Sequence, residues 1–312
     1  MTSEIMLVPY DPAWPGQFEL EAQKIKNALG ANCIMIHHIG STSIKGIHAK
    51  PIIDVIPVVK DILDVDKHND AMTALGFTPR GELGMPFRRF FQRKTGIHIN
   101  AHVFEENDPE IERNLVFRDH MNNNLADREA YSNLKVQLGS NITDITEYVL
   151  KKDPFIQNIF NKIKLNGFRF VQALTDNEWS GYRKIMQEEL FDRMGITFDP
   201  NHWTMKATDH YKFVFIKGTT VIGAAMIAWM GESESILRTF AIDSDYQNQG
   251  FGRHFLKLLM RWAQHQGKKT MFLHSLNEAV PFYKHNGFSP MSFVDRVPEE
   301  VAKDVIDLGR NL

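Results

Sequence analysis

The sequence predicts an α+β protein made of two domains, and two observations lead to this fold class. The chain has 312 residues, 43% of them hydrophobic and 24% charged, which is enough for two globular cores of ordinary size. Short β-branched or aromatic runs bounded by glycine or proline alternate with longer stretches of helical periodicity, without repeats or low-complexity segments. We predict a boundary near Asn166-Gly167, which gives domains 1–166 and 167–312.

The first domain is expected to combine a mixed sheet with helices. A helix is predicted over 12–30, because apolar residues recur at helical spacing and Gly30 suits a left-handed cap. Strands are predicted over 33–40 and 51–59, and a strand pair over 88–94 and 98–106 turns at Thr95-Gly96. Further helices are expected at 61–77, 111–124, 127–139 and 144–164, the last kinked or split at Pro154.

The second domain is expected to centre on a mostly antiparallel sheet flanked by helices. It begins with a strand at 168–174 and a helix at 177–195, for which Thr175 or Asp176 is the N-cap. Two strands within 210–229 turn at Lys217-Gly218. The remaining predicted elements are a strand at 235–243, a helix at 250–267, a strand at 270–275, a short helix at 277–286 and a last segment at 287–294.

The composition disfavours several functional classes. The formal net charge of −2 gives no concentrated basic character, so a nucleic-acid partner is not expected. No run approaches eighteen consecutive apolar residues, and the N-terminus lacks a basic-then-apolar signal pattern, so neither membrane insertion nor secretion is expected. The single cysteine, Cys33, fits a reducing compartment. We therefore expect a cytoplasmic protein.

A glycine loop precedes the helix at 250–267. The stretch YQNQGFG, residues 246–252, lacks the Gly-Lys-Ser/Thr of a P-loop and the third glycine of a dinucleotide fingerprint. Its spacing lets successive backbone N–H groups and the helix dipole face a pyrophosphate without a Cβ in the way. An ordinary glycine turn with an N-cap is the alternative interpretation.

Residues 168–295 resemble the GNAT-type N-acetyltransferases. FAIDSDYQNQGFGRHFLKLLMRWAQ matches that family's acetyl-CoA pyrophosphate loop, and LHSLNEAVPFYKHNGF, residues 273–288, matches its second cofactor-side segment. The resemblance implies acetyl-CoA as the cofactor and a primary amine of a small molecule or peptide as the acceptor. It implies that the cofactor is bound by the strand backbone at Phe240, Ala241 and Ile242, by the loop residues Gln247, Asn248, Gln249, Gly250, Phe251, Gly252 and Arg253, and by Asn277.

The resemblance also implies a general acid. Tyr283 falls where the family's tyrosine often protonates the thiolate leaving group of coenzyme A. A phenol has an ordinary pKa near 10, above about 8.5 for a thiol, so it is a proton donor at neutral pH. The alternative is that Tyr283 only packs its ring beside Phe282 and Phe288.

The attacking amine must lose a proton, so a base should lie near the strand at 235–243. Glu234 is our first candidate and Glu232 the second, because both stand at the entry to that strand, although solvated glutamates are common at strand ends. His274 is a third candidate, since the ordinary pKa of histidine is better matched to this task; a satisfied core or cofactor-side histidine is the alternative interpretation. We expect segments such as 180–205, which vary within the family, to form the acceptor pocket. Their sequence does not identify the acceptor.

The N-terminal domain carries a second pattern, HHIGSTSIKGIHAKPIIDV, residues 37–55. A glycine-serine turn after one strand and Asp54 on the next resemble the nucleotidyltransferase pattern, in which the turn contacts phosphates and carboxylates hold a divalent metal. Such sites usually need a second carboxylate two residues away, but Asp54 is followed by Val55 and Ile56. The pattern therefore predicts binding more than nucleotidyl transfer.

Residues 6–165 resemble the GrpB-like proteins, which are related by fold to nucleotidyltransferases. The segments that carry the resemblance are VPYDPAWPGQFELE, HIGSTS, AKPIIDV and ERNLVFRDH. The resemblance implies a nucleotidyltransferase-like fold and a site for a phosphorylated or nucleotide-like ligand. The residues of this predicted ligand site are Gly40, Ser41, Ser43, Lys50, Asp54 and His102.

A metal site in the same domain stays an open question. Strand alternation puts His98, Asn100 and His102 on one face, and with Asp54 nearby these side chains could ligate a transition metal. A polar face exposed to water is the interpretation that we favour.

These observations lead to one predicted function with two alternatives. We predict an acetyl-CoA-dependent N-acetyltransferase whose N-terminal domain binds a phosphorylated or nucleotide-like ligand. The alternatives are a bifunctional protein with an active N-terminal nucleotidyltransferase, and a protein that binds acyl-CoA or nucleotide without catalysis.

Overall fold

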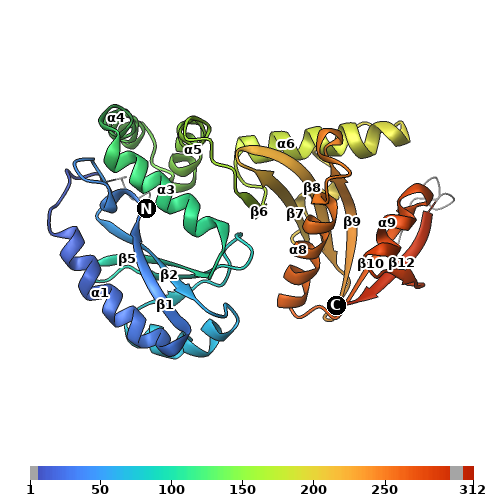
Figure 1. Cartoon of the computed structure of the whole chain (residues 1–312), viewed down its shortest axis with the longest axis horizontal. Coiled ribbons are helices and arrows are strands. Elements are labelled where there is room, and N and C mark those ends of the chain that lie inside the picture. The colour runs from blue at the N-terminus through green and yellow to red at the C-terminus, as the bar shows by residue number, and fades with distance from the viewer. Residues whose placement is uncertain (1–5, 296–304) are drawn as a thin grey trace. The chain divides into compact units, whose positions relative to one another are not determined.

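The structure is a computed structural model of the chain and describes residues 6–295 and 305–312. The chain divides into two compact units, Met1–Phe168 and Arg169–Leu312, each with its own sheet and helices (Figure 1). The predicted α+β fold class with two domains is confirmed. The boundary predicted from the sequence lies two residues before this division.

The first unit is built on a five-stranded mixed sheet with the strand order β1-β2-β5-β4-β3. Strands β2 and β5 run parallel, and the pairs β1–β2, β4–β5 and β3–β4 run antiparallel. The hairpin predicted across Thr95-Gly96 is the β4–β5 pair. The strands are β1 (Cys33–Ile39), β2 (Ile52–Val59), β3 (Thr78–Pro79), β4 (Arg89–Arg93) and β5 (His98–Glu105).

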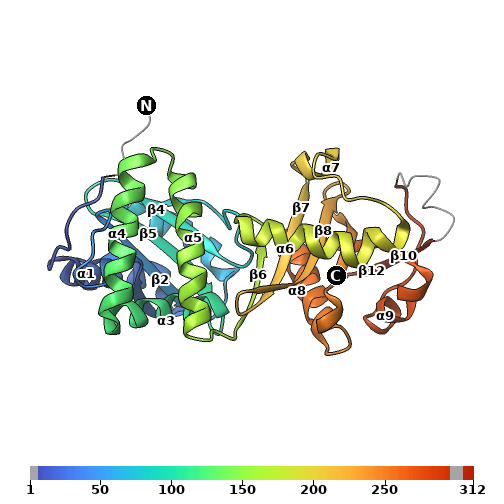
Figure 2. The ribbon, with the colours of Figure 1, turned by 90° about the horizontal axis from the view of Figure 1, so that it is seen from above.

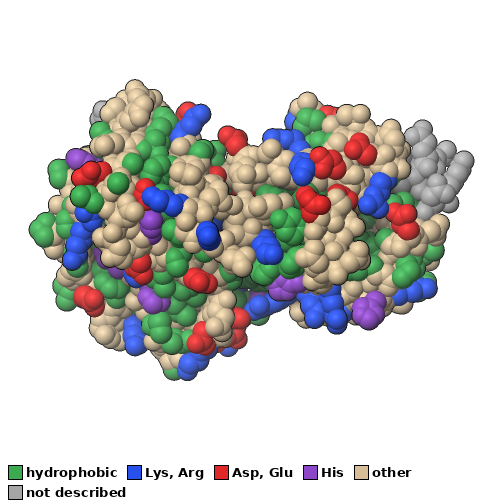
Figure 3. All heavy atoms as spheres, turned by 45° about the horizontal axis from the view of Figure 1, so that its top comes forward, with side chains coloured by type: hydrophobic (Ala, Val, Ile, Leu, Met, Phe, Trp, Pro, Cys, Tyr) green, Lys and Arg blue, Asp and Glu red, His purple; other side chains and the backbone are tan. Residues whose placement is uncertain are grey.

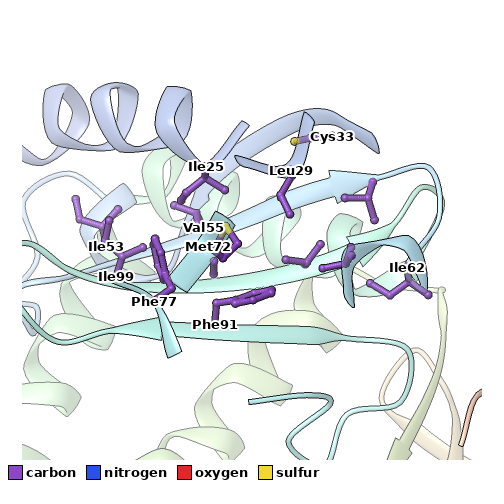
Figure 4. Close-up of a cluster of buried hydrophobic side chains, with 14 of the residues drawn as sticks. Ile25, Leu29, Cys33, Ile53, Val55, Ile62, Met72, Phe77, Phe91 and Ile99 are labelled. Carbon is purple, nitrogen blue, oxygen red and sulfur yellow. The ribbon is translucent and has the colours of Figure 1, made fainter. Parts of the chain in front are cut away.

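One face of this sheet packs on helices α1 (Trp14–Leu29) and α2 (Asn69–Ala74). Because alternate strand residues point to the same face, β2 and β5 each contribute every second residue to this core (Figure 4). Helix α1 ends at Gly30, whose φ of 60° is positive as predicted, but its ψ of −145° lies outside the left-handed helical region. The buried side chains include Ile25, Leu29, Ile53, Val55, Phe91 and Ile99.

The opposite face of the sheet carries the other alternate residues. Ile56 and Val58 of β2 pack with side chains of helix α3 (Pro109–Asn123), and Asp54 has the same alternation and points to this face. Helices α4 (Leu125–Asn141) and α5 (Ile145–Lys162) pack against each other (Figure 2). Helix α5 continues through Pro154, so the predicted split at this proline does not occur.

The second unit contains a seven-stranded sheet with the order β11-β12-β10-β9-β8-β7-β6. Strands β9 and β10 pair in parallel, whereas β7–β8, β8–β9, β10–β12 and β11–β12 pair antiparallel, which confirms the predicted mostly antiparallel sheet. Strand β12 is absent from our sequence predictions. The strands are β6 (Phe168–Gln172), β7 (His210–Lys217), β8 (Thr220–Trp229), β9 (Glu234–Ile242), β10 (Thr270–Leu276), β11 (Ser289–Pro290) and β12 (Val305–Asn311).

Helices α6 (Asp176–Met186) and α8 (Phe251–His265) cover the two faces of this sheet. Helix α6 begins at the predicted N-cap Thr175, whose side chain forms a capping box with Glu178. It continues into a π-helical turn, η4 (Gln187–Phe191), and a 3₁₀ turn, η5 (Asp192–Met194). A short helix α7 (Trp203–Lys206) precedes β7, and helix α9 (Val280–His285) follows β10.

None of the helices in the described residues is long and apolar enough to cross a membrane. On the face shown in Figure 3, acidic and basic side chains are interspersed on each unit rather than gathered by sign.

Candidate functional site

Strands β9 and β10 separate soon after they meet, and this split shapes the second unit. Their parallel pairing runs from Glu234 opposite Thr270 to Ile236 opposite Phe272 and then ends. Strand β9 nevertheless continues to Ile242, and β10 to Leu276. The edge of β9 that faces away from β8 is therefore left without a neighbouring strand over its last residues.

A β-bulge at Arg238 accompanies the split. In the pairing of β9 with β8, Thr239 lies opposite Met226 and Leu237 opposite Ile227, so Arg238 has no partner residue. An extra residue bends a strand and changes the direction of its side chains. Consistent with this, Arg238 and Thr239 both line one pocket, although neighbours on a regular strand point to opposite faces.

A first pocket, with a volume of about 740 Å³, lies at the C-terminal end of β9. It brings together the end of this strand, the predicted glycine loop, the start of α8 and helix α9. Eight of the predicted cofactor-binding residues line it: Phe240, Ala241, Ile242, Gln247, Asn248, Gly250, Gly252 and Arg253. The lining residues absent from the sequence predictions are Glu189, Arg193, Ala279, Phe282, His285 and Asn286.

The glycine loop has the backbone that its sequence predicts. Gly250 is the N-cap residue of α8 with a φ of 86°, and Asn248 has a φ of 58°, a region that asparagine tolerates better than most residues. A Cβ at position 250 would meet no atom within 4 Å, so there is room for a side chain. Glycine is favoured there because of its positive φ. At Gly252 the φ is ordinary, and a Cβ would touch Ile242 and Phe282 at 3.5 Å.

Glu189 holds the loop from the π-helical turn η4. Its carboxylate accepts hydrogen bonds from the backbone N–H of Ser244 at 2.8 Å and from the Gln247 side chain at 3.1 Å. The same Gln247 amide donates to the carbonyl of Ile242 at 2.8 Å. Gln247 therefore links the loop to β9, and the π-helical turn η4 positions Glu189 within hydrogen-bond distance of the loop.

Tyr283 lines the first pocket from helix α9 and is 8% exposed. Its ring packs against Phe282 and Phe288, with centroids 5.2 and 5.7 Å away. Burial raises the pKa of its hydroxyl well above the ordinary value, which keeps the phenol protonated at neutral pH. The two interpretations of Tyr283, packing and proton donation, are thus compatible in one position.

Three predicted cofactor residues lie away from the lining of this pocket. Gln249 is exposed and donates to the carbonyl of Asp245, Phe251 packs near Tyr246, and Asn277 is exposed at the start of η7 (Asn277–Ala279). Their predicted contacts to the cofactor stay predictions.

A second pocket, of about 410 Å³, lies on the other side of the split. The segment 180–205 supplies much of its wall, with apolar side chains such as Met186, Phe191 and Phe198. The buried hydroxyls of Tyr182 and Thr239 also line it. Thr239 is close enough to oppose the rise that burial causes in the pKa of Tyr182, yet neither oxygen has a partner of ordinary hydrogen-bond geometry.

His274 belongs to this second pocket, where it is held by two carboxylates. Its Nδ1 lies 2.8 Å from Oδ1 of Asp307, and its Nε2 lies 3.1 Å from Oδ2 of Asp295. Arg238 also binds Asp295, through both terminal nitrogens. Both ring nitrogens of His274 therefore face carboxylates, which hold the ring in this network, and its role as a base stays a prediction.

The two glutamates predicted as bases stand at the other end of β9. Glu234 is exposed and pairs with Thr270, and it lines neither pocket. Four residues of extended chain, roughly 13 Å, separate it from Arg238. Glu232 is exposed in the preceding turn. A catalytic role of Glu234 stays a prediction, and it would require a chain of waters.

In the first unit, the glycine turn and the aspartate meet as predicted. Gly40 has a φ of 68°, and a Cβ there would lie 2.5 Å from Oδ2 of Asp54, so the turn lies directly on this carboxylate. Asn100 donates to Oδ1 of Asp54 at 2.9 Å, and Nε2 of His102 is 3.9 Å from the same oxygen. His98 is exposed at the start of β5.

The two predicted serines differ in their surroundings. The Ser43 hydroxyl donates to the Gly40 carbonyl at 2.6 Å and so closes the turn itself. Ser41 lies near the buried hydroxyl of Tyr131 on helix α4. Among the described residues, no group of three or more His, Cys, Asp or Glu side chains is arranged to hold a metal ion.

Comparison with known proteins gives two family matches that follow this division. The sequence profile of the family described as GrpB protein matches residues 4–162, and that of the Acetyltransferase (GNAT) family matches residues 169–288. The second match supports an acetyltransferase activity.

Among curated proteins, the chain is 38% identical over 158 residues to UPF0157 protein YqkA of Bacillus subtilis, covering 49% of this chain and 46% of YqkA. The match thus spans about half of that relative's length. A solved structure of GrpB from Enterococcus faecalis is 36% identical, with a TM-score of 0.48, and covers 50% of this chain and 96% of that one. An acetyltransferase structure from Streptococcus agalactiae is 12% identical, with a TM-score of 0.41, and covers 47% and 99%. The chain belongs to the GrpB family through its N-terminal domain, and its C-terminal domain is an acetyltransferase domain of the GNAT family.

Proposed function

We propose that the protein is an acetyl-CoA-dependent N-acetyltransferase that acts on a primary amine. The observation that carries this proposal is the split between β9 and β10, which has the glycine-loop pocket on one side and a largely apolar pocket on the other. Two ligands that must react with each other would meet across the free edge of β9. This is the arrangement that transfer of a group between them requires.

The residues of the first pocket suit the phosphate-containing end of acetyl-CoA. Gly250 and Gly252 leave the backbone at the start of α8 accessible, and the helix dipole favours an anion there. Arg253 adds a positive charge to the lining. The free backbone edge of β9 at Phe240–Ile242 can pair with the amide groups of the pantetheine arm. When bound, acetyl-CoA supplies the acetyl group.

Tyr283 is the proposed general acid. Its hydroxyl is held protonated by burial and lines the same pocket as the loop. During transfer the amine nitrogen forms a bond to the acetyl carbon, the carbon–sulfur bond breaks, and Tyr283 donates its proton to the leaving sulfur. Glu234 is the proposed base and would receive the amine proton through water.

The second pocket is the proposed acceptor site. Its apolar wall suits an amine that carries an aliphatic or aromatic group, and the Tyr182 and Thr239 hydroxyls offer hydrogen bonds to its polar end. Among the described residues that line this pocket, Asp199 is a carboxylate without an ion-pair partner, and it would attract an ammonium group.

The N-terminal domain is proposed to bind a phosphorylated or nucleotide-like ligand without transferring a nucleotidyl group. The contact of Gly40 with Asp54 forms a polar site at the end of β1 and the start of β2. Within the described part of the chain, Asp54 is the carboxylate that this site contains, and one carboxylate neutralises two magnesium ions poorly.

The acetyltransferase proposal is tested by release of the CoA thiol from acetyl-CoA with a panel of primary amines. We expect release that depends on the amine and prefers acceptors with an apolar group. Binding of acetyl-CoA without release by any amine would favour the non-catalytic alternative.

A separate assay tests the N-terminal role. Nucleoside triphosphates are incubated with magnesium, manganese or zinc, and pyrophosphate is measured. We expect binding without release. Steady release that is lost in Asp54→Ala would make the protein bifunctional.

A further inference from the structure

Three lysines converge near Asp54 from three different segments of the first unit. Lys50 comes from the loop before β2, Lys135 from α4 and Lys152 from α5. Burial lowers the pKa of all three lysines, and Asp54 acts on each in the opposite direction. Lys50 also lowers the pKa of Lys135 and of Lys152, and Lys152 lowers that of Lys135. We call Lys50, Lys135 and Lys152 the lysine cluster. It was missed in the sequence analysis, apart from Lys50.

Tyr148 of α5 packs against two of the three lysines of the cluster. The Nζ atoms of Lys50 and Lys152 lie 4.4 and 4.5 Å from the centroid of its ring. Its hydroxyl is buried and has no hydrogen-bond partner among the described residues, and the whole residue is 2% exposed. An unpartnered hydroxyl in such a place costs free energy unless a ligand uses it.

The cluster also lacks counter-ions. In the part of the chain that the structure describes, no carboxylate oxygen lies within ion-pairing distance of Lys50, Lys135 or Lys152. Lys135 is 1% exposed and donates a hydrogen bond to the backbone carbonyl of His48. This carbonyl carries no charge and is therefore not a counter-ion. The aromatic rings offset part of the cost of burying these charges, but three ammonium groups exceed the one carboxylate, Asp54.

We propose that the lysine cluster and the Tyr148 hydroxyl form a binding site for a di- or triphosphate group of a small molecule. The inference rests on the proposed phosphorylated ligand of this domain and specifies its chemistry. Two of the ammonium groups lie on the Tyr148 ring, whereas that of Lys135 lies over the Tyr131 ring. A chain of phosphates has oxygens spread over a longer distance than a single phosphate and can therefore contact all three groups more closely. Lys50 and Lys152, which both lie on the Tyr148 ring, bind the phosphates together with Lys135 of α4, and the Tyr148 hydroxyl donates a hydrogen bond to a phosphate oxygen.

The pKa directions agree with an anion site. Burial, with a smaller contribution from the neighbouring lysines, lowers the pKa of Lys135 to about 7 and that of Lys152 to about 8. Lys50 and Asp54 are the other ionised groups that face them, and Tyr131 and Tyr148 stay neutral because burial raises their pKa values. A bound polyphosphate would restore the positive charges, so binding should take up protons near pH 8.

The test is calorimetry on the full chain with ATP, inorganic triphosphate, AMP and adenosine as probes, in phosphate-free buffers. ATP and inorganic triphosphate should bind, AMP at least tenfold more weakly, and adenosine not at all. ATP that binds while inorganic triphosphate does not would show that the nucleoside and not the phosphate chain is recognised, and would overturn the proposal. The series is repeated with the Gly252→Val variant, in which the first pocket of the second unit is blocked. Binding that remains in this variant does not come from that pocket.

The variants sharpen this test. Lys152→Met or Lys50→Met should each weaken triphosphate binding about 10- to 100-fold, the loss expected for one charged hydrogen bond. Lys151→Met is the matched control, because Lys151 is the exposed neighbour on α5, and it should bind normally. Tyr148→Phe keeps the ring and removes only the hydroxyl, and it should also weaken binding.

Two results would overturn the inference in different ways. If AMP and ATP bind with equal affinity and the lysine variants bind as the wild type does, the domain still binds a phosphorylated ligand, but not at the lysine cluster. Failure of every phosphorylated probe to bind would remove the proposed ligand of the N-terminal domain as well. Either result is read independently of acetyl transfer.

Discussion

The two domains build their candidate sites from different materials. The first pocket of the second unit takes most of its predicted lining from one stretch, residues 240–253, and uses backbone conformation there. The lysine cluster of the first unit takes side chains from a loop, α4 and α5, and Asp54 from β2. A site made of local backbone is encoded by neighbours in the sequence, whereas a site made of distant side chains depends on how helices pack.

The largest effect is expected at the backbone-built site. Gly252→Val should abolish detectable acetyl-CoA binding, because a branched side chain would project into the pocket beyond the Cβ position that already touches Ile242 and Phe282. Gly252→Ala is the matched control and should retain binding, since a Cβ alone fits at 3.5 Å. Calorimetry measures both. Equal affinity of Gly252→Val and wild type would break the assignment of this pocket to the pyrophosphate.

A smaller loss is expected where the same site relies on one side chain. Tyr283→Phe should lower turnover by about 10²–10⁴-fold, the usual contribution of a general acid, with acetyl-CoA affinity nearly unchanged because the ring still packs. Turnover is measured under conditions in which chemistry limits the rate. A variant with wild-type turnover would remove Tyr283 from the mechanism.

Glu234 should have a weaker effect. Glu234→Gln is expected to lower kcat/KM by about tenfold, below the range for a base in direct contact, because this carboxylate acts from a distance through water. Steady-state kinetics with a saturating concentration of acetyl-CoA measures the loss. Glu232→Gln provides the comparison on the neighbouring turn. An unchanged kcat/KM in Glu234→Gln would transfer the role of base to another group.

The smallest effect concerns stability in the other domain. The pKa of Lys135 is lowered on folding to about 7, so the unfolded chain binds more protons between about pH 7 and its ordinary value. Stability is therefore lost as the pH falls through this window, and Lys135→Met should raise the melting temperature by a few degrees at pH 6 and by less at pH 9. Thermal unfolding of the full chain measures the difference. A gain that is larger at pH 9 would contradict the assigned direction.

The fold was readable from the sequence to a large extent. Glycine and proline punctuate the strands of both sheets, and Thr175 with Glu178 marks the start of α6 by the capping box that the structure contains. Of the two outcomes predicted at Pro154, a split does not occur, because α5 continues through this exposed proline from Ile145 to Lys162. A kink there stays a prediction. Strand β12 went unnoticed because its sequence, VIDLGRN, includes Asp, Gly and Asn, which are depleted in strands.

The sites were readable only in part, for the same physical reason. The loop glycines and Tyr283 could be located, since local spacing and a family motif place them together. Glu189 could not, because its contact with Gln247 spans 58 residues and depends on a π-helical turn. Likewise, nothing in the spacing of Lys135 and Lys152 indicates that both approach Asp54.

The short pairing of β9 with β10 also has a mechanical consequence. Three residue pairs join these strands, whereas seven join β10 to β12. The backbone ladder therefore connects β10, β11 and β12 to the rest of the sheet at one corner. A ligand bound in the split would add hydrogen bonds between β9 and the group of strands β10, β11 and β12, and would hold these two parts of the sheet together. When the ligand is bound, the amide protons of β9 and of β10 on the two sides of the split should both exchange with solvent more slowly than in the free protein, and by a similar factor.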